Sequence, residues 1–580
     1  MTRLEPVIRR AAIPDALPQL ELGISPVLCR VYGIRGITEA AQLDYSLDGL
    51  IPPARLGNTD RAARLLAEMV RRNGRILIVA DFDADGATSC ALAIRALRGM
   101  GAEHLSFMVP NRFVDGYGLT RKIAEKALSR SPDLVVTVDN GISSLEGVRL
   151  LREQGVDVLI TDHHLAGAEL PEASVIVNPN SPGEAFPSKH LAGVGVVFYV
   201  MIALRALLRE EGWFVGNSLA EPNLGELLDL VALGTVADVV RLDRNNRLLV
   251  QQGLQRIRAG QCCPLIKALL TGASRPLENV VAADLGFVVG PRLNAAGRID
   301  DMAVGIVGLL SDSSAEATAT AQLLDQLNRE RRLIEQGMKE QATRLLDGME
   351  LEGALPSGIC VFDAGWHQGV IGILASRIKE RYHRPVIAFA EEDEQMLKGS
   401  ARSIPSVHIR DALDAIATAN PDLLARFGGH AMAAGLSLLK KDLDVFRQCF
   451  DEEIARRLEG EPRNGELLSD GPLSRSERTL ALAEQIARGG PWGQGFPEPL
   501  FDDRFQVLSQ REVGTGHGRM TLRGCSDGGE YTAIAFNQAE KLPKMPGTEI
   551  HAVYRLSVNT YRGDRQMQLQ IIHFTVTSNE

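Results

Sequence analysis

Three carboxylates stand within five residues, directly after an apolar run. Asp81, Asp83 and Asp85 follow the run Ile76–Ala80. Carboxylates this close repel one another unless a cation lies between them, and clusters rich in oxygen suit Mg²⁺ or Mn²⁺. A solvated acidic turn that caps the following helix is the alternative interpretation. An EF-hand calcium loop does not fit, because no Glu stands at the twelfth position of the loop.

Three later apolar runs also end in acidic or imidazole side chains. These side chains are Asp139 after LVVTV, the trio Asp162, His163 and His164 after VDVLIT, and Asp238 after LLDLVALGTVA. A single polar end of this kind is usually a cap or a turn. Open α/β sheets, however, place their sites at the carboxyl ends of strands, and four such ends in one half of the chain predict a shared metal site.

The motifs DxDxDG, VDNG, TDHH and GTVAD, in this order, resemble those of the DHH phosphoesterase superfamily. The rest of the chain, from about residue 50 to about residue 575, is similar to the bacterial single-stranded-DNA exonucleases of that superfamily. The resemblance implies two Mn²⁺ or Mg²⁺ ions with six protein ligands: Asp81, Asp83, Asp85, Asp139, His163 and Asp238. We take Asp139 as the candidate bridging ligand and, with His163 and His164, as catalytic. His164 is expected to face the scissile phosphate, and Asp162 to orient a histidine.

Two stretches in the first half of the chain could bind substrate. Residues 109–119 hold Arg112, whose guanidinium can bind two phosphate oxygens, and Tyr117, whose ring can stack on a base. A plain surface role is the alternative for Arg112, but the resemblance places it near the 5′ end of the substrate. Residues 284–301 read as a loop interrupted by glycines, in which the resemblance implies a phosphate contact for Arg298.

Two further substrate-binding stretches lie after residue 390. Residues 398–403 predict a basic, hydroxyl-rich turn that holds Ser400 and Arg402. Gly429 and His430 belong to a Gly-Gly-His sequence that predicts a helix start, where backbone N–H groups can cradle a phosphate, although a tight turn explains it as well. Both stretches resemble the DHH-associated domain, and the resemblance assigns all four residues to substrate binding.

The elements that position these residues predict an α/β fold in several domains. Strand and helix alternate from residue 75 to about 250, which predicts a parallel sheet. A helical pattern from 314 to 348 predicts a long connecting helix, and five β-rich runs after 495 predict an OB-like β-barrel. The expected domains are an N-terminal extension packed on the first domain (1–55), a DHH catalytic domain (56–305), the connecting helix (306–350), a second α/β, DHH-associated substrate-binding domain (351–460), and a linker with an OB-fold DNA-binding domain (461–580).

Composition and charge limit which ligands and which cellular location can be expected. The net charge is −10, which taken globally argues against a nucleic-acid binder and requires a local basic groove if DNA is the ligand. Six arginines of the expected barrel could share a face: Arg511, Arg519, Arg523, Arg555, Arg562 and Arg565. The seven cysteines are scattered and include no CxxC, so neither a zinc site nor a disulfide framework is indicated, and a cytoplasmic location is the default. No membrane span and no signal peptide are expected.

The resemblance implies a metal-dependent 5′→3′ exonuclease that degrades single-stranded DNA to mononucleotides in DNA repair and recombination. It also implies a RecQ-type helicase and a single-strand-binding protein as partners of a monomer. One alternative is a phosphodiesterase that acts on short RNA oligomers, cyclic dinucleotides or pyrophosphate, and deletion of residues 465–580 should separate the two functions. Another is a non-catalytic scaffold in a replication complex.

Overall fold

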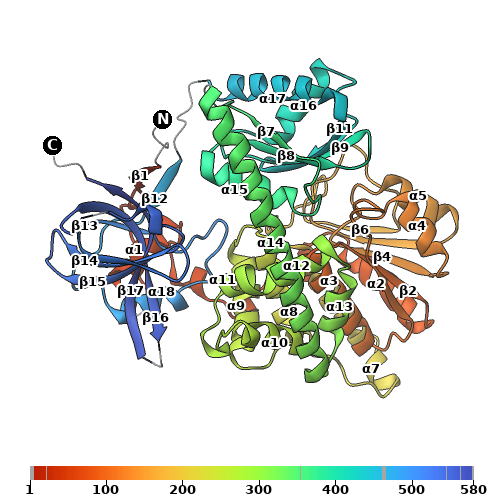
Figure 1. Cartoon of the computed structure of the whole chain (residues 1–580). Coiled ribbons are helices and arrows are strands. Elements are labelled where there is room, and N and C mark those ends of the chain that lie inside the picture. The colour runs from red at the N-terminus through yellow and green to blue at the C-terminus, as the bar shows by residue number, and fades with distance from the viewer. Residues whose placement is uncertain are drawn as a thin grey trace. The chain divides into compact units, whose positions relative to one another are not determined.

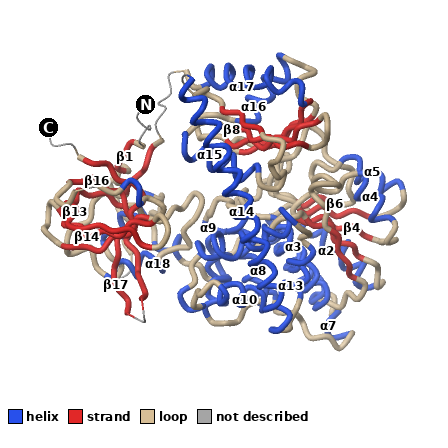
Figure 2. The backbone as a smooth tube through the Cα atoms, viewed as in Figure 1, coloured by secondary structure: helices blue, strands red, loops and turns tan. Residues whose placement is uncertain are grey.

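The computed structural model describes residues 6–20, 23–352, 355–459, 465–543, 545–561 and 564–577. Internal contacts divide the chain into two compact units, which we describe separately (Figures 1 and 2). The larger unit comprises residues 8–297, 301–324 and 467–580, and the smaller unit comprises residues 325–466 with residues 298–300 and the start of the chain. No helix among the described residues is long and apolar enough to cross a membrane.

A parallel sheet forms the centre of the larger unit, as predicted. Its order is β3-β2-β4-β5-β6, with these bounds: β2 (Ile76–Ala80), β3 (Leu105–Met108), β4 (Leu134–Val138), β5 (Asp157–Thr161) and β6 (Val175–Val177). Every residue of β2 and β4 is buried, which explains why these strands read as unbroken apolar runs rather than alternating ones.

Helices cover both faces of this sheet. On one face, α4 (Arg121–Leu128) and α5 (Leu145–Glu153) pack against alternate residues of the strands, such as Val79 and Val135. α2 (Thr59–Arg71), α3 (Ala84–Gly99) and α6 (Gly193–Glu210) pack against one another and against the sheet on the other face (Figure 1). The sheet ends at β6, so the expected alternation of strand and helix stops there rather than near residue 250.

The chain between residues 213 and 310 is helical. Its helices are α7 (Trp213–Gly216), α8 (Leu228–Ala237), α9 (Arg244–Arg258), α10 (Pro264–Gly272), α11 (Ala282–Asp284), a π-helix (Leu285–Val289), α12 (Gly290–Ile299) and α13 (Ala303–Leu310). The prediction of a loop over 284–301 was therefore wrong. Gly290 and Pro291 lie at the start of α12, where proline is tolerated. Gly297 lies within α12, and glycine is needed there because a Cβ would lie 1.9 Å from the Phe82 carbonyl oxygen.

Residues 467–577, which we call the barrel module, confirm the predicted barrel. Its closed order is β13-β14-β15-β17-β16, with these bounds: β13 (Phe501–Val513), β14 (His517–Gly524), β15 (Glu530–Ala535), β16 (Glu549–Tyr561) and β17 (Asp564–Val576). β15 and β17 pair in parallel, and the other pairs are antiparallel. α18 (Leu480–Arg488) packs on β16 and β17.

The N-terminal residues pack on two parts of the larger unit. β1 (Val7–Arg10) pairs with β12 (Glu466–Ser469), and Arg35, next to α1 (Pro26–Ile34), forms a buried ion pair with Asp470 at 2.6 Å. Tyr45, farther along, accepts a hydrogen bond from Arg247 of α9 at 3.1 Å. The extension therefore contacts the barrel module as well as the first domain, on which alone it was expected to pack.

The smaller unit is a second α/β layer structure. Its sheet has the order β10-β11-β9-β8-β7, with these bounds: β7 (Ile359–Phe362), β8 (Val386–Glu391), β9 (Met396–Arg402), β10 (Arg426–Gly429) and β11 (Ala433–Leu439). One face packs on α15 (Ile371–Tyr382) and on the long helix α14 (Ser314–Glu352), which begins in the larger unit. The other face packs on α16 (Ile409–Ala419) and α17 (Leu443–Arg457).

Two local predictions in the smaller unit were wrong. Residues 396–402 form strand β9 rather than a turn, because Leu397 and Ala401 point into the core and Gly399 packs on Phe389. The Gly-Gly-His sequence lies in the β10–β11 hairpin and starts no helix. Gly429 has a φ of +147°, and a Cβ there would lie 2.4 Å from the Ala433 carbonyl oxygen, so the close approach of the two strands requires glycine.

Candidate metal centre

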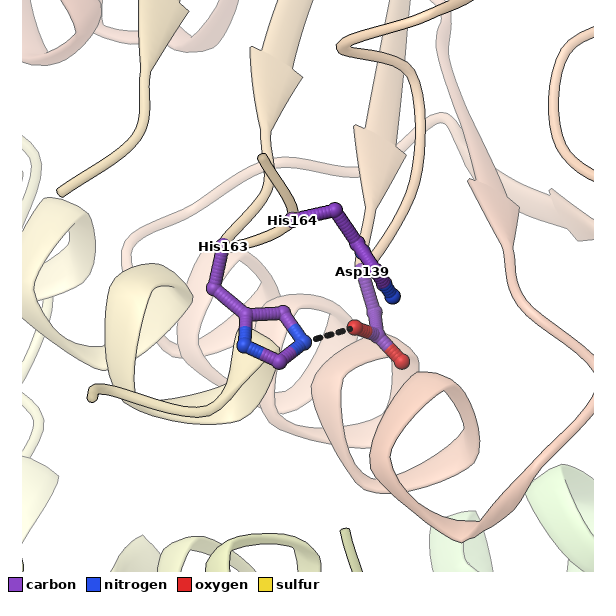
Figure 3. A group of neighbouring side chains, drawn as sticks. All are labelled: Asp139, His163 and His164. Carbon is purple, nitrogen blue, oxygen red and sulfur yellow. Dashed lines mark ion pairs between the residues drawn. The ribbon is translucent and has the colours of Figure 1, made fainter. Parts of the chain in front are cut away.

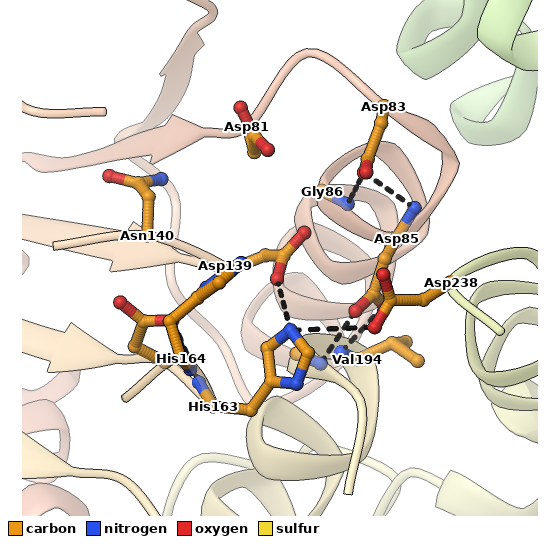
Figure 4. A network of polar contacts seen from close by, with 12 residues as sticks. Asp81, Asp83, Asp85, Gly86, Asp139, Asn140, His163, His164, Val194 and Asp238 are labelled. Atoms are coloured by element: carbon orange, nitrogen blue, oxygen red, sulfur yellow. Dashed lines mark hydrogen bonds and ion pairs between the residues drawn. The ribbon is translucent and has the colours of Figure 1, made fainter. Parts of the chain in front are cut away.

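The loop after β2 is held in one shape by its own acidic residues. The Asp83 carboxylate caps α3 by accepting hydrogen bonds from the backbone N–H groups of Asp85 and Gly86, each at 3.0 Å (Figure 4). A Cβ at Gly86 would lie 2.5 Å from the Asp81 carbonyl oxygen. The N–H of Ala84 donates to Asn294 Oδ1 at 2.8 Å. The spacing of the three aspartates is therefore fixed before any ion binds.

Asp85 is buried at the start of α6. Its carboxylate accepts hydrogen bonds from the backbone N–H groups of Gly193 at 2.6 Å and Val194 at 3.0 Å. A Cβ at Gly193 would lie 2.6 Å from Asp139 Cβ, so glycine is needed for this approach. The start of α6 therefore packs on Asp139 and binds the Asp85 carboxylate.

Asp139 and His163 meet in the interior, as Figure 3 shows. The Asp139 side chain follows β4 with a backbone φ of +62°, an uncommon conformation that clusters at functional sites. His163 Nε2 lies 3.1 Å from Asp139 Oδ1 and 3.5 Å from Asp238 Oδ2 (Figures 3 and 4). Among the described residues, neither Asp139 Oδ1 nor His163 Nε2 has a hydrogen-bond partner, although both atoms are buried. A cation would satisfy two buried donor atoms that face each other in this way.

The buried acids of this region are held away from their ionised form. Burial, followed by repulsion from Asp238, raises the pKa of Asp85 to about 7. Burial and the charge of Asp83 raise the pKa of Asp238 to about 8. Burial and the other carboxylates also raise the pKa of Asp81 and Asp139 well above the usual range. Burial lowers the pKa of His163, which favours the neutral imidazole that binds metals. Divalent cations would supply the missing positive charge.

Three groups of donor atoms could hold a metal ion, and two of them together fit two ions; the third is Asp139, His163 and His164. Asp81, Asp83 and Asp139 place one oxygen each within 4.8 Å of one another, and Asp85, His163 and Asp238 do the same. Asp139 belongs to the first group and lies 3.1 Å from His163 of the second, so it is placed to bridge. We call these six residues the metal centre. Asp238 caps the helix α8, so the fourth apolar run of the sequence is a helix rather than a strand.

His164 lies next to Asp139 and His163 and is held by Asp162. Its Nδ1 lies 2.7 Å from Asp162 Oδ1, and the same carboxylate accepts hydrogen bonds from the N–H groups of His163, His164 and Ile142. Burial acts to lower the pKa of His164, but the Asp162 hydrogen bond and the surrounding acids outweigh it and raise the pKa to about 9. The histidine that Asp162 orients is therefore His164, and in the metal-free protein this pKa favours its protonated form.

Arg112 and Tyr117 lie beside the metal centre. The Arg112 guanidinium stacks 4.0 Å from the ring centre of Phe82, the residue between Asp81 and Asp83. The Tyr117 ring, which is half exposed, packs edge-on against Phe82 and His164, and its hydroxyl donates to the Asp139 carbonyl oxygen at 3.3 Å. The larger unit thus brings together both substrate-binding candidates of its first half with the acids and histidines.

The smaller unit brings together Ser400 and Arg402 of β9. Arg402 donates to Ser400 Oγ at 3.1 Å, and a Cβ at Gly372, in the first turn of α15, would lie 2.9 Å from both side chains. Arg298 donates to the Gly369 carbonyl oxygen at 3.2 Å, just before the same helix. A helix N-terminus with an arginine and a hydroxyl is suited to an anion. Gly429 and His430 lie in the β10–β11 hairpin of the same sheet.

Sequence reasoning missed two groups of residues in these sites. The N–H groups that hold Asp85 come from a short Ala-Gly-Val sequence, and its only signal was a small residue before a helix. Asn294 stands in the segment that was expected to be a loop, and its side chain accepts a hydrogen bond from the N–H of Ala84.

Three family descriptions match the chain. They are "DHH family, N-terminal domain" over residues 75–235, "DHHA1 domain" over residues 356–456 and "RecJ OB domain" over residues 469–573. The order of the three matches follows the order of the domains that the sequence predicts.

Known proteins are similar to the chain along nearly all of its length. The single-stranded-DNA-specific exonuclease RecJ of Salmonella typhimurium is 50% identical over 559 residues, which cover 96% of this chain and 97% of that protein. The crystal structure of Thermus thermophilus RecJ in complex with Mn²⁺ superimposes with a TM-score of 0.78 at 28% identity and covers 99% of this chain and 80% of that chain. The complex of the same protein with Mg²⁺ gives a TM-score of 0.72 at 27% identity, over 99% and 78% of the two chains.

Proposed function

Because the chain belongs to the RecJ family of single-stranded-DNA-specific exonucleases, we propose that the metal centre is where it cuts the terminal phosphodiester bond of single-stranded DNA. The observation that carries this assignment is the pair of buried, unsatisfied atoms Asp139 Oδ1 and His163 Nε2, set among four further acids. The enzyme is a metal-dependent hydrolase. The 5′→3′ direction and the mononucleotide product are part of the proposal.

The six residues of the metal centre would hold two ions, Mn²⁺ or Mg²⁺. Asp81, Asp83 and Asp139 would hold one ion, and Asp85, Asp139, His163 and Asp238 the other. Two bound ions of this kind stabilise both the attacking and the leaving oxygen of an in-line phosphoryl displacement. A histidine beside carboxylates suits Mn²⁺ better than Mg²⁺, although both fit the oxygen donors.

The chain's own residues would bind and orient the scissile phosphate. In the metal-free protein the pKa of His164 favours its protonated form, and Asp162 holds the ring, so it can donate a charge-assisted hydrogen bond to a phosphate oxygen. Arg112 lies on Phe82 beside the acids of the first ion, where its guanidinium can bind a second phosphate. The exposed face of Tyr117 can stack on the terminal base.

In the smaller unit we propose a second phosphate site. Ser400, Arg402 and the start of α15 supply a hydroxyl, a guanidinium and backbone N–H groups, and Arg298 lies beside them. Gly429 and His430 are assigned to the same substrate.

We propose that the barrel module guides the strand along β13 and β14. Arg511 and Arg519 stand directly opposite each other on these strands, and both side chains are exposed. Like charges in this position are destabilising unless an anion lies across them. Among the described residues, no ion pair or side-chain hydrogen bond involves either guanidinium, whereas Arg523, Arg555 and Arg565 pair with Glu530, Glu498 and Glu484. Arg562 lies outside the described residues.

The remaining assignments are proposals that follow from this chemistry. An enzyme restricted to single strands depends on a helicase that unwinds duplex DNA, such as one of the RecQ type, and it meets single-strand-binding protein on its substrate. All six ligands come from one chain, which supports a monomer. DNA as substrate and seven free thiols support a cytoplasmic location and a role in repair and recombination. The five-part domain division predicted from the sequence, from the 1–55 extension to the 461–580 OB domain, is retained.

End-labelled substrates test the proposal. Single-stranded DNA, duplex DNA and RNA, each labelled at the 5′ or the 3′ end, are incubated with Mn²⁺ or Mg²⁺. We expect release of labelled mononucleotides from the 5′ end of single-stranded DNA alone, and no release by an Asp139→Ala variant. An active Asp139→Ala enzyme would refute the metal assignment. Preferred cleavage of short RNA or dinucleotides would restore the alternative, which the full-length similarity to RecJ does not favour.

A further inference from the structure

Asp238 is the ligand of the metal centre that stands at the C-terminal end of a helix. It caps the end of α8, with its N–H bonded to the Gly234 carbonyl oxygen at 2.9 Å, and the chain then turns sharply. The next residue, Val239, has a φ of +59° and is 65% exposed. A β-branched residue at positive φ is an outlier and persists only where the surrounding structure holds it there. Something beyond Val239 must therefore fix the chain.

The anchor beyond Val239 is Leu242, and a turn of the barrel module holds it. The N–H of Leu242 donates to the Gln494 carbonyl oxygen at 2.7 Å. The Leu242 side chain is buried against Gly493, where a Cβ would lie 2.7 Å from Leu242 Cδ1. Residues 493 and 496 pair as an isolated bridge, so the turn Gly493–Phe496 has a defined shape. Both contacts cross from the barrel module to the segment that carries a metal ligand.

The backbone carbonyl of Leu242 is held by Arg247, which also contacts this turn. Arg247 donates to the Leu242 carbonyl oxygen at 3.0 Å. Its guanidinium lies 4.2 Å from the ring centre of Phe496, and Phe496 is itself stacked on Trp492 at 5.1 Å. Both polar backbone groups of Leu242 are therefore fixed, one directly by the turn and one through a cation–π contact with it.

We infer that the turn Gly493–Phe496 is a brace that holds Val239 and Asp238 in place, so that the barrel module supports binding of one of the two metal ions. This positioning role is separate from guiding DNA, and it rests on the proposed function of Asp238 as a ligand. Asp81, Asp83 and Asp139 do not depend on the brace, so only the ion at Asp85, His163 and Asp238 is affected. Deletion of residues 465–580 would remove brace and barrel together and would therefore disturb metal binding as well as DNA guidance.

The test is Mn²⁺ binding to the metal-free full-length protein, measured from the free Mn²⁺ signal in electron paramagnetic resonance. Gly493→Ala pushes the turn away from Leu242 and should weaken one ion about tenfold while leaving the other unchanged. Hydrogen exchange of residues 239–243 in the metal-free protein should become faster. Gly518→Ala is the matched control, because its Cβ would lie 2.6 Å from Leu542 inside the barrel, far along the chain from the brace. It should leave both readouts unchanged.

Two further variants separate positioning from general destabilisation. Val239→Asn, added to Gly493→Ala, should restore Mn²⁺ affinity to within about twofold of wild type, because asparagine tolerates positive φ. Phe496→Leu removes the ring beneath Arg247 but keeps an apolar side chain, and should weaken the same ion about threefold even if Gly493→Ala does not fold.

The outcomes are distinguishable. Wild-type Mn²⁺ affinity and unchanged exchange in Gly493→Ala, or in Phe496→Leu if the former does not fold, would overturn the brace. Asp238→Asn should lose the same ion outright. If Asp238→Asn binds both ions with wild-type affinity, the ligand assignment under the proposed function fails instead.

Discussion

The larger unit contains two buried clusters of charged side chains that differ in completeness. In the metal centre, five acids surround a neutral histidine, and burial and mutual repulsion hold four of these acids away from their charged form. In the barrel module, the guanidinium of Arg478 is fully buried and faces Asp503, Asp527, Tyr531 and Tyr554, a set that we call the Arg478 cluster. Each nitrogen of Arg478 lies next to an oxygen, among them Asp503 Oδ2 at 2.7 Å and Tyr554 Oη at 3.1 Å.

The difference shows which buried charges serve function. The Arg478 cluster carries its counter-charges within the protein and ties the start of α18 to the barrel strands, so its charges are balanced as folded. The metal centre has five acids, four of them with raised pKa values, and no cationic side chain among its six residues, so its charges are balanced only by cations from solution. Changes in the first cluster should therefore alter stability, and changes in the second should alter activity and metal binding.

The largest expected effect is that of Asp139→Asn on activity. Loss of the bridging carboxylate should lower the rate of DNA cleavage by more than the roughly 10–100-fold that follows loss of a residue supporting a metal ligand. The metal-free variant should be at least as stable as wild type, because a buried acid that resists ionisation is replaced by a neutral amide. Exonuclease assays and thermal unfolding measure the two quantities. Asp157→Asn, at the opposite end of the sheet, is the control, and an equal drop in activity there would show that the effect is not specific to the metal centre.

Arg478→Met should lower stability and leave metal binding unchanged, which is the reverse of the effect expected for Asp139→Asn. Removing the cation leaves Asp503 and Asp527 buried without it, which should lower the free energy of unfolding by about 3–5 kcal/mol. Mn²⁺ affinity of the folded protein should not change. Denaturant unfolding and Mn²⁺ titration are the measurements, with Arg565→Met as control, because its half-exposed pair with Glu484 should contribute under about 1 kcal/mol. A stable Arg478→Met protein would show that the cluster is not structural.

The metal centre should make the metal-free protein less stable as pH rises, whereas the Arg478 cluster should contribute less stability as pH falls. The raised pKa values of Asp85 and Asp238 give the metal-free protein stability that is present below their ordinary value of 3.8 and is lost as pH rises to about 7 and about 8. Burial opposes ionisation of Asp527, but the Gly529 N–H, Tyr531 and Arg478 outweigh it and lower its pKa, so its contribution is lost as pH falls.

Thermal unfolding of metal-free wild type and the Asp139→Asn and Arg478→Met variants between pH 4 and pH 8 measures this contrast. Arg478→Met should be relatively less destabilised at low pH than at pH 8. Saturating Mn²⁺ should abolish the loss of stability at the alkaline end in wild type. An alkaline loss of stability that Mn²⁺ does not change would place its origin outside the metal centre.

The smallest expected effect concerns the exposed arginines of the barrel. Arg511→Glu with Arg519→Glu should weaken binding of long single strands and reduce the slope of log affinity against log salt by about 0.7 for each phosphate that the barrel no longer neutralises. Fluorescence anisotropy at several salt concentrations gives the slope. Cleavage of oligonucleotides too short to reach the barrel, and Mn²⁺ affinity, should not change. Arg523→Glu, whose partner is Glu530, is the control.

Sequence reasoning predicted the strand ends and the barrel well, because each depends on local pattern. Asp81, Asp139 and His163 each follow a short, largely apolar run, and such runs placed them at one edge of a parallel sheet. The barrel strands have alternating apolar and polar residues and are joined by turns that contain glycine, as is typical of a small β-barrel. The helical nature of residues 284–301 was missed because glycines were read as breaks. Gly297 is there for its close approach to Phe82, and no local pattern reveals a neighbour so distant in the chain.

Contacts between site residues and residues far away in the chain also could not be predicted from the sequence. Val239 carries no sign of its positive φ, and nothing in Gly493–Phe496 points to Leu242. These contacts depend on how the barrel module meets the helices of the larger unit, which only the folded chain defines. The same holds for the N–H groups of Gly193 and Val194 at Asp85.

Diffraction from Mn²⁺-soaked crystals at the manganese absorption edge tests the two-ion metal centre most directly. We predict two anomalous peaks about 3.5–4 Å apart, one on each side of the Asp139 carboxylate, and neither peak in Asp139→Asn crystals. A single peak, or peaks that leave Asp139 and His163 without contact to an ion, would contradict a two-ion centre bridged by Asp139.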